Sequence, residues 1–458
     1  MEVGFVNRIA RRSAAMFLLV ALLVGGLGFF VVECIMKGDS WVMSPGSPHV
    51  YNGTNIGCGT VTDRDGVLLL DTNDGRDYAR LEALRKATLH WLGDRYGYIS
   101  APAVAHYAQQ MAGFDPVNGL YSYGGAGVTQ LPLSSRIQLA ALEAMGARKG
   151  TVAVYDHRTG QILCAGSTPT YEPDDPPVIG EDNAQAYEGV YMNRFLKSAY
   201  VPGSIFKLVT AAAALEEIPG IREETFRCTA SYDYPTDPVT CEYAHGEMSF
   251  DQALAQSCNC VFAGIVDRLG AQTLERYVRK YKVTERVSFD GVTTASGNFT
   301  VEDAGPDQIA WAGIGQHRDQ IVPCAYLTFV GAIANGGVAA KPHIVSKVTC
   351  GTDVTYEAST QKGERIMSEQ TAKALREMMR CAVVEKYGAE NFPDLTVCAK
   401  SGTAQSDNKA SNALFTGFVA DEDLPLSFIV IVEEGGYGRQ ACVPVISSVL
   451  EVCREVLS

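Results

Sequence analysis

Positive charge is scarce in this chain. Its 458 residues include 38 lysines and arginines against 52 aspartates and glutamates, so the net charge at pH 7 is −14. This balance argues against a nucleic acid as partner and leaves no basic patch for an anionic lipid surface. The chain also has no internal repeat and no low-complexity tail.

Metal-binding patterns are missing as well. The seven histidines are scattered, and no H-E-x-x-H sequence occurs. Cys258-Asn-Cys260 is too closely spaced to make a clean zinc pair. We therefore expect no metal site and no cofactor.

An uncharged apolar run extends from Ala14 to Val32, with three arginines before it and Glu33 after it. Its length is sufficient for a helix that spans a membrane. The arginines predict that residues 1–13 stay in the cytoplasm and that everything after Glu33 faces outward. A cleaved signal peptide is the alternative, but the run is long for one and no Ala-x-Ala site follows.

Thirteen cysteines are unusual in an exported chain. The odd number leaves at least one unpaired, and the spacing shows no short disulfide framework. Cys228 and Cys241, which bracket a loop rich in Pro, Asp and Tyr, form the most plausible disulfide. The alternative, thirteen buried thiols in a low-oxygen habitat, stays open.

The hydrophobic content of 47% allows a large core, and the length allows two or more domains. Residues near the apolar run are rich in Gly, Pro, Ser and Asn, which is typical of a linker. We predict a cytoplasmic tail, a transmembrane helix, a linker, a small pedestal module and a catalytic domain at residues 1–13, 14–32, 33–59, 60–145 and 146–458.

Strand patterns lie at both ends of the last region. Residues 151–155 and 161–165 flank a turn and predict a hairpin, and three strand-like runs cover 395–404, 413–420 and 426–433. Helical patterns fill the interval, and a final helix covers 444–456. We expect a mixed α and β fold, with one central, mostly antiparallel sheet flanked by helices and a helical subdomain.

Three short motifs occur in order: Ser204-Ile-Phe-Lys207, Ser257-Cys-Asn259 and Lys400-Ser-Gly-Thr403. A Pro-Gly turn precedes Ser204 and an alanine-rich helical run follows, so Ser204 and Lys207 share one helical face. Other S-x-x-K sequences begin at Ser359 and Ser406, but each lies in a polar stretch typical of a solvated loop. The ordered set of motifs is what distinguishes the first.

The motifs contain the groups of a serine acyl-enzyme. Ser204 is the expected nucleophile and Lys207 its base, which requires a neutral lysine. Lowering a lysine pKa from about 10.4 to about 7–8 requires burial and a second cation, and Lys400 can supply that charge.

The remaining motif residues have possible catalytic roles, and some of them are also typical of ordinary structural positions. Ser257 can relay a proton and Asn259 can hold Lys207, although alone they are typical of a helix cap and a turn. Gly402 in a strand leaves room for a substrate backbone. The N–H groups of Ser204 and Thr403 can form an oxyanion hole.

The order of these motifs resembles the transpeptidase domain of class B penicillin-binding proteins, from about Thr151 to the end. The resemblance extends to further short sequences: Asn193-Arg194, His245-Gly246, Gly313-Ile-Gly-Gln316, Ala334-Asn-Gly-Gly337 and Asp63-Arg-Asp-Gly66. His317 and Pro323-Cys-Ala depart from the family pattern near the site.

The resemblance implies a serine D,D-transpeptidase that cross-links peptidoglycan stem peptides ending in D-Ala-D-Ala. Ser401 and Thr403 would bind the terminal carboxylate beside Lys400, and β-lactams would acylate Ser204. We see no glycosyltransferase region, which favours dependence on a membrane glycan polymerase as partner.

Alternatives on the same fold are a β-lactamase-like hydrolase, a D,D-carboxypeptidase, and a β-lactam-binding sensor or scaffold. Neither Glu181 nor Glu188 follows the Ser-x-Asn motif, where class A β-lactamases place their water-activating glutamate. A sensor would need a cytoplasmic effector larger than the predicted tail, and the intact motifs argue against an inactive scaffold.

Overall fold

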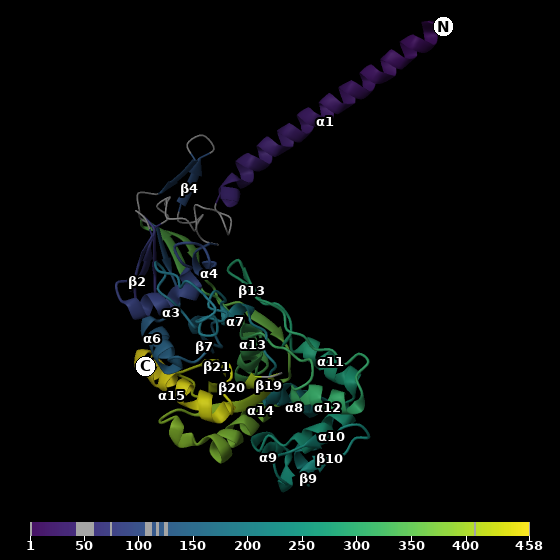
Figure 1. Ribbon diagram of the computed structural model, residues 1–458, viewed down its shortest axis with the longest axis vertical. Coiled ribbons are helices and arrows are strands. Elements are labelled where there is room, and N and C mark those ends of the chain that lie inside the picture. Colours follow the sequence, from purple (N-terminus) through teal and green to yellow (C-terminus); the bar gives the residue numbers. More distant parts are fainter. Residues whose placement is uncertain are drawn as a thin grey trace.

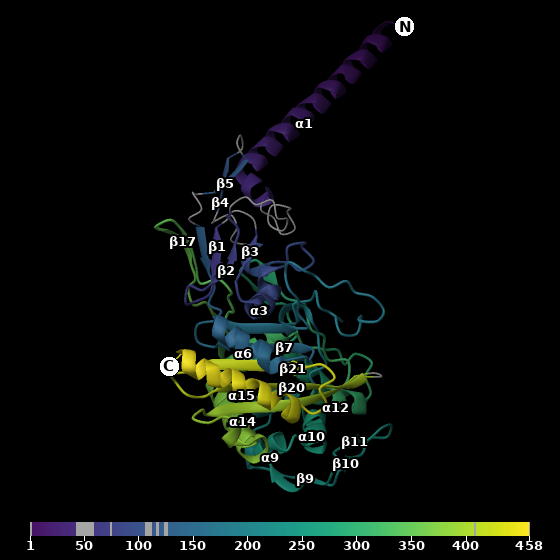
Figure 2. The ribbon, with the colours of Figure 1, turned by 60° about the vertical axis from the view of Figure 1, so that its left-hand side comes forward.

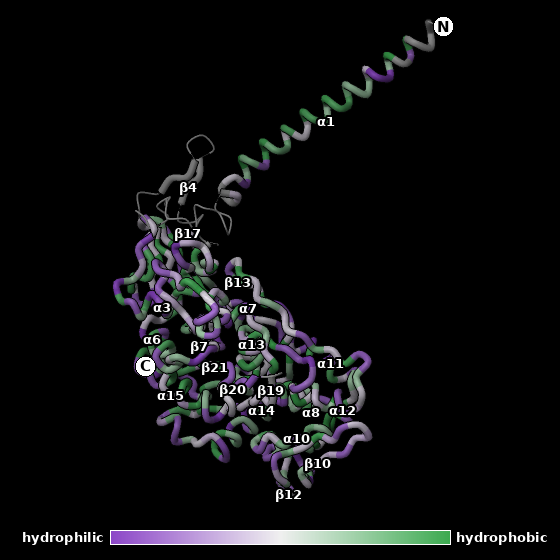
Figure 3. The backbone as a smooth tube through the Cα atoms, in the orientation of Figure 1, coloured by the Kyte–Doolittle hydropathy of each residue, from purple (hydrophilic) through white to green (hydrophobic). Residues whose placement is uncertain are grey.

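The computed structural model describes residues 2–42, 59–73, 76–105, 112–115, 119–122, 127–406 and 409–457. A long helix, α1 (Glu2–Val42), projects away from the body of the molecule (Figure 1). Its stretch Ile9–Gly38 is long and apolar enough to cross a membrane, and Figure 3 shows its hydrophobic colouring. The helix continues beyond Val32 into the predicted linker, and residues 43–58 of that linker lie outside the described residues.

The body nearest α1 contains a six-stranded sheet with the order β17-β16-β6-β1-β2-β3. Its strands are β1 (Thr60–Thr62), β2 (Leu68–Asp71), β3 (Asp77–Tyr78), β6 (Gly127–Gln130), β16 (Lys347–Cys350) and β17 (Asp353–Glu357). The last two come from the predicted catalytic domain, and β16 pairs directly with β6. The pedestal is therefore not confined to residues 60–145, because a distant hairpin completes its sheet.

A buried carboxylate joins this pedestal to the rest of the body. Asp63 Oδ1 accepts hydrogen bonds from the N–H groups of Asp65 and Val67, which shapes the turn between β1 and β2. Asp63 Oδ2 accepts a third from the N–H of Ser135, at the start of α6 (Ser135–Met145). The Asp63-Arg-Asp-Gly66 sequence thus both makes a turn and holds a helix.

The central sheet is antiparallel throughout, with the order β19-β20-β21-β7-β8, as predicted. Its strands are β7 (Gly150–Asp156), β8 (Ile162–Thr168), β19 (Val397–Ser406), β20 (Lys409–Val419) and β21 (Leu426–Val432). Helices α6 and α15 (Gly438–Leu457) cover one face (Figure 2). Helices α13 (Pro323–Ala334) and α14 (Glu369–Ala382) pack on the other.

Successive residues of β7 enter different parts of the core. Val152 and Val154 pack in the hydrophobic cluster that contains α15, whereas Ala153 and Tyr155 pack in the cluster that contains α13. Because side chains alternate across a strand, a sheet covered on both faces needs a continuous apolar run. This explains the consecutive apolar residues 152–155 of β7 and 428–432 of β21.

A helical subdomain lies beside the β19 edge of the sheet (Figure 1). Its helices are α8 (Lys207–Glu217), α9 (Phe250–Ala255), α10 (Asn259–Leu269), α11 (Ala271–Lys280) and α12 (Pro306–Ile314). Its strands form two-stranded sheets from β9 (Thr225–Cys228) with β12 (Gly246–Ser249) and from β10 (Ser231–Tyr232) with β11 (Val239–Thr240). A third pair, β13 (Ser288–Phe289) with β14 (Val292–Thr293), lies beside α7 (Figure 1).

The shorter elements connect these parts. They are α3 (Glu82–Leu92), α4 (Pro102–Ala105), β4 (Ala112–Asp115), β5 (Gly119–Ser122), α7 (Arg194–Lys197), η1 (Gly203–Phe206), η2 (Ile221–Glu223), β15 (Val338–Ala340), β18 (Lys362–Arg365), η3 (Val383–Tyr387) and η4 (Ala389–Asn391).

Candidate active site

A cleft of about 930 Å³ lies between β19 and the helical subdomain. Residues from all three sequence motifs line it: Ser204, Ser257, Asn259, Ser401 and Thr403. The two motif lysines, Lys207 and Lys400, are fully buried behind this lining. The structure therefore brings together segments that are separated by about two hundred residues in the sequence.

The Ser204 turn begins the alanine-rich helix, as the sequence predicts. Ser204 lies in the 3-10 turn η1, which continues directly into α8 at Lys207. Lys207 Nζ lies 3.1 Å from Ser204 Oγ. The nucleophile candidate and its base candidate are therefore in contact, while the serine remains partly exposed to the cleft.

Ser257 lies in the turn that separates α9 from α10, and its φ is +56°. A serine in this left-handed region is strained, and strain of this kind clusters at functional sites when the surroundings enforce it. Neighbouring backbone bonds hold the turn, because Ser257 N–H donates to Leu254 O and Cys258 N–H donates to Ala253 O.

Lys207 Nζ is surrounded by four oxygens. It donates to Ser257 O at 2.6 Å and to Asn259 Oδ1 at 2.7 Å, and it lies 3.2 Å from Ser257 Oγ. The Asn259 amide is fixed in this orientation because its Nδ2 donates to Thr240 O. The two shortest contacts are therefore to oxygens that can only accept.

This arrangement suits a neutral lysine. A neutral amine has two protons and one lone pair, whereas a hydroxyl can donate as well as accept. If the neutral amine donates its two protons to Ser257 O and Asn259 Oδ1, its lone pair can accept the proton of the Ser204 hydroxyl. Burial favours this state and lowers the pKa of Lys207 to about 8.

Lys400 shares a partner with Lys207. Its Nζ donates to Ser257 Oγ at 3.0 Å and to Ser401 O at 2.8 Å. Burial, together with the positive charge of Lys207, holds the pKa of Lys400 well below its usual range. Ser257 Oγ thus lies between two amines that cannot both be charged without cost.

Alternation along β19 separates the residues of the third motif. Ser401 and Thr403 face the cleft, whereas Lys400 and Gly402 are buried. A Cβ on Gly402 would lie 2.8 Å from Pro202 O and 3.1 Å from Ile205 Cγ2. We expected this glycine to leave room for a substrate backbone, but its close neighbour is the turn that holds Ser204.

Two residues that sequence reasoning did not assign hold the third motif in place. Tyr387 Oη accepts hydrogen bonds from Ser401 N–H at 2.9 Å and from Ser401 Oγ at 3.0 Å. Gln316 Nε2 donates to Thr403 O at 2.7 Å. Gln316 lies in the Gly-Gln sequence already noted, but no local pattern distinguishes Tyr387, which follows α14 in the π turn η3.

The competing sequence candidates lie outside this constellation. Ser359 is exposed in the loop before β18, and the Ser406–Lys409 segment falls partly outside the described residues. Glu188 forms ion pairs with Lys149 and Lys409. Neither Glu188 nor Glu181 lines the cleft.

A family model for the penicillin-binding protein transpeptidase domain matches residues 150–451. The chain belongs to this family. Peptidoglycan D,D-transpeptidase PbpA of Mycobacterium tuberculosis is 29% identical to this penicillin-binding transpeptidase over 338 residues, which cover 66% of each chain. Stage V sporulation protein D of Bacillus subtilis is 28% identical over 323 residues, which cover 66% of this chain and 48% of the relative.

Solved structures agree with the family assignment. A ceftriaxone acyl-enzyme complex of penicillin-binding protein A from M. tuberculosis superposes with a TM-score of 0.73 at 22% identity, covering 88% of this chain and 99% of that one. The D,D-transpeptidase domain of a peptidoglycan glycosyltransferase from Eggerthella lenta gives a TM-score of 0.71 at 25% identity, covering 87% and 98%. The mixed α/β transpeptidase fold is therefore confirmed.

Proposed function

We propose that this chain is a class B penicillin-binding protein, a serine-type D,D-transpeptidase that cross-links peptidoglycan stem peptides and is acylated by β-lactams on Ser204. One observation carries the proposal. A buried lysine, Lys207, contacts the Oγ of a partly exposed serine while its other neighbours are oxygens that accept its protons.

Acylation begins with proton transfer. Neutral Lys207 takes the proton of Ser204 Oγ, and the oxygen attacks the carbonyl of the penultimate D-Ala. The N–H groups of Ser204 and Thr403 bind the developing oxyanion. The bond to the terminal D-Ala breaks, and its amine leaves with a proton that Ser257 relays from the lysine pair.

The second half of the reaction transfers the acyl group from Ser204 to an acceptor amine, and the proton transfers run in the reverse direction. The amine of a neighbouring stem peptide attacks the ester carbonyl and loses a proton to the lysine pair through Ser257. The ester bond breaks as Lys207 returns that proton to Ser204 Oγ. The product is a new amide between two stems. Without an acceptor amine, water at the same position would make the chain a D,D-carboxypeptidase.

Substrate recognition follows from the third motif. The terminal carboxylate, or the carboxylate of a β-lactam, binds to the hydroxyls of Ser401 and Thr403, which face the cleft. Buried Lys400 contributes charge behind them, and its contact with Ser401 O supports this placement. Tyr387 orients Ser401 through the two hydrogen bonds described above.

We place the catalytic body outside the cell, anchored by α1 with its N terminus in the cytoplasm. The arginines before the apolar run support this orientation. A membrane glycan polymerase supplies the strands that are cross-linked. The solved complex of Helicobacter pylori PBP2 with MreC, a fold relative with a TM-score of 0.63, is an example of a relative that works in an assembly.

Labelling with a fluorescent penicillin tests this function. Wild type is expected to form a long-lived covalent adduct, and Ser204→Ala to form none, because losing the nucleophile of a catalytic unit costs about a million-fold in rate. Ser359→Ala is the matched control and should label normally. Labelling that survives Ser204→Ala would contradict the site assignment.

Product analysis separates the reactions that share this fold. Incubation with a synthetic stem peptide and an acceptor amine should give the transpeptidation product and free D-Ala. An adduct that turns over within seconds and releases hydrolysed penicillin would instead identify a β-lactamase.

A further inference from the structure

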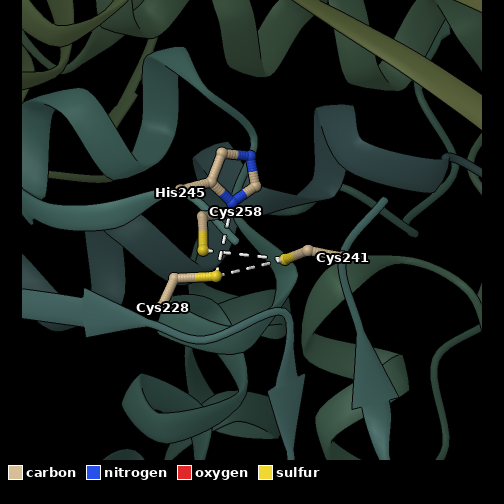
Figure 4. A group of neighbouring side chains, drawn as sticks. All are labelled: Cys228, Cys241, His245 and Cys258. Carbon is tan, nitrogen blue, oxygen red and sulfur yellow. Dashed lines mark hydrogen bonds between the residues drawn. The ribbon is translucent and has the colours of Figure 1, made fainter. Parts of the chain in front are cut away.

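Four potential metal ligands meet directly behind the Ser257 turn. The sulfurs of Cys228, Cys241 and Cys258 and the ring of His245 point toward one another from three segments, since Cys241 and His245 lie in the same connection between β11 and β12 (Figure 4). Their ligand atoms all lie within 4.8 Å of one another. We propose that these residues bind one Zn²⁺ ion, and that the ion braces the Ser257–Asn259 element.

Three of the six separations between the ligand atoms are close to those of a tetrahedral zinc site. Zn–S bonds of about 2.3 Å and Zn–N bonds of about 2.0–2.1 Å place two ligand sulfurs about 3.8 Å apart and a sulfur and a nitrogen about 3.6 Å apart. The Cys228–Cys241 and Cys241–Cys258 sulfur separations are 3.8 Å and 3.7 Å. Cys228 Sγ lies 3.3 Å from His245 Nδ1. Three thiolates and one imidazole are also a ligand set that favours zinc among the common divalent metals.

The surroundings support bound thiolates. Backbone N–H groups in the first turn of α10, those of Cys260 and Val261, lie near the sulfurs of Cys241 and Cys258. Such outer contacts are usual around metal ligands, and they stabilise the deprotonated sulfur. Binding releases the three thiol protons to solvent and involves no redox step.

An entry path is present as well. Cys228 and Cys258 are buried, whereas Cys241 and His245 line the catalytic cleft. An ion can therefore reach the site from the cleft and then be enclosed by the two buried sulfurs. The site is thus continuous with the active site, although its ligands are not among the residues proposed to react.

The ligands join elements that have little support of their own. Cys228 ends β9, His245 precedes β12, and Cys241 follows β11. These strands form two-stranded sheets, which are marginally stable in isolation. One ion would fix both small sheets to the start of α10.

The link to catalysis runs through Cys258. It lies between Ser257, whose backbone is strained, and Asn259, whose amide oxygen accepts from Lys207. A metal bond at Cys258 would hold this turn in its left-handed conformation against relaxation. This positioning role rests on the proposed function, whereas zinc binding itself does not.

The sequence led to a different expectation. The spacing of Cys258-Asn-Cys260 alone indicates no zinc pair, because the other ligands lie in separate segments of the sequence. Cys228 and Cys241, the pair favoured as a disulfide, are free thiols in the structure. Cys260 Sγ lies 3.4 Å from Cys241 Sγ but is directed at Val239 O, outside the group of four.

Metal analysis of the full chain in detergent tests the site. Reduced wild type supplied with zinc and then gel-filtered is expected to retain about one zinc per chain, and Cys228→Ser and Cys241→Ser to lose it. Cys381→Ser is the matched control, because its thiol lies on α14 and contacts Glu385. It should retain zinc like wild type.

A measurement on wild type guards against variants that fail to fold. Replacing zinc with Co²⁺ should give the strong thiolate-to-metal charge-transfer bands and the visible bands of tetrahedral cobalt. Wild type that stays metal-free, or Co²⁺ without thiolate bands, would overturn the site. So would a Cys228–Cys241 disulfide found by non-reducing peptide mapping of protein that labels with penicillin.

The proposed bracing of the Ser257–Asn259 element by zinc is tested separately, through the rate of penicillin acylation. Removing zinc with a chelator should lower the second-order rate of penicillin acylation at least about tenfold, and adding zinc back should restore it. An unchanged rate would overturn the bracing role. Zinc-loaded wild type that is not acylated at all would instead contradict the proposed function, while the metal and cobalt measurements would still decide the site.

Discussion

Lys207 and Lys400 share one hydroxyl, Ser257 Oγ, and both are fully buried. Two ammonium groups on one buried oxygen are costly, so the pair is expected to carry a single positive charge in the resting site. Lys207 has a lone pair available beside Ser204, and Lys400 can keep the charge near the carboxylate-binding hydroxyls. Without a bound carboxylate the pKa shifts point the other way, because the charge of Lys207 holds the pKa of Lys400 well below its usual range. The proposed division of roles therefore requires a bound carboxylate beside Ser401 and Thr403, which would draw the charge onto Lys400.

The pH dependence of the acylation rate should show the titration of Lys207, the proposed base. The pKa of Lys207 is lowered from 10.5 to about 8, so its neutral fraction rises with pH through that value. The second-order acylation rate of wild type, measured from about pH 6 to about pH 10, should rise and then flatten with a midpoint near 8.

Lys207→Arg should abolish this rise of the acylation rate with pH, because arginine keeps the positive charge but is not deprotonated in proteins. We expect the acylation rate to fall by about a hundredfold to ten-thousandfold, with antibiotic affinity much less affected. A variant within a few-fold of wild type, with the same pH profile, would mean that the proton of Ser204 goes elsewhere.

Tyr387→Phe tests the support of Ser401. The ring stays packed edge-on against Phe415, but Ser401 N–H and Oγ lose their shared acceptor. Leaving a buried donor unpaired costs about 1–3 kcal/mol, so binding of the antibiotic before acylation should weaken roughly tenfold or more. The limiting acylation rate should change little. Tyr98→Phe, at an exposed ring, is the control, and equal effects on both rate and affinity would argue against an orienting role.

At the level of elements, the site depends on how closely η1 approaches β19. Gly402 is the contact point, and its missing side chain lets the Pro202 carbonyl lie against the strand. Gln316, just after α12, reinforces the same junction through its hydrogen bond to Thr403 O. The nucleophile and the strand that binds the carboxylate are therefore kept in register by backbone contacts.

Gly402→Ala should disturb this junction. The added methyl group would overlap Pro202 O, and overpacking of this kind costs about 1–3 kcal/mol. We expect a lower melting temperature and slower acylation, since η1 must move away from β19. Gly166→Ala in β8 of the same sheet is the control, because its Cβ would meet only ordinary contacts at 3.7 Å and beyond. Equal effects of the two substitutions would show that the junction has no special role.

Elements with a strong local signal were predictable from the sequence. The 151–165 hairpin and the three C-terminal strands appear where their patterns indicated, and the final helix does so with an earlier start, at Gly438. The Ser204 turn was also recognisable, because Pro-Gly and an alanine-rich run identify a helix start. Contacts made across the fold were not predictable: nothing near Tyr387 indicates Ser401, and only Cys241 and His245 among the four ligands are close in sequence.

At the level of the whole molecule, the pedestal and the catalytic body share a sheet. Strands β16 and β17 leave the body to extend the pedestal, and the buried Asp63 carboxylate joins β1 to the start of α6. A boundary at residues 145 and 146 therefore cuts through paired strands. The two parts are expected to behave as one cooperative unit.

Truncation tests this interdependence. Residues 59–458 should give a folded protein that binds penicillin, because only α1 and the segment after it are removed. Residues 59–145 alone should not fold, since the β6 edge would lack β16 and two of the six strands would be missing. Circular dichroism and limited proteolysis would show this. A stable, protease-resistant 59–145 fragment would contradict the shared sheet as a requirement for folding.

The position of β16 and β17 in the sequence also has a consequence for biosynthesis. A ribosome makes β1, β2, β3 and β6 early, but their sheet cannot be completed until the chain has been extended past Glu357. Domains that are continuous in sequence can fold one after another as they emerge. Here the pedestal strands wait, with the edge of β6 unpaired, until most of the enzyme has followed them. An unpaired strand edge is a template for pairing with another chain, so this interval is when the nascent pedestal is most open to misassembly.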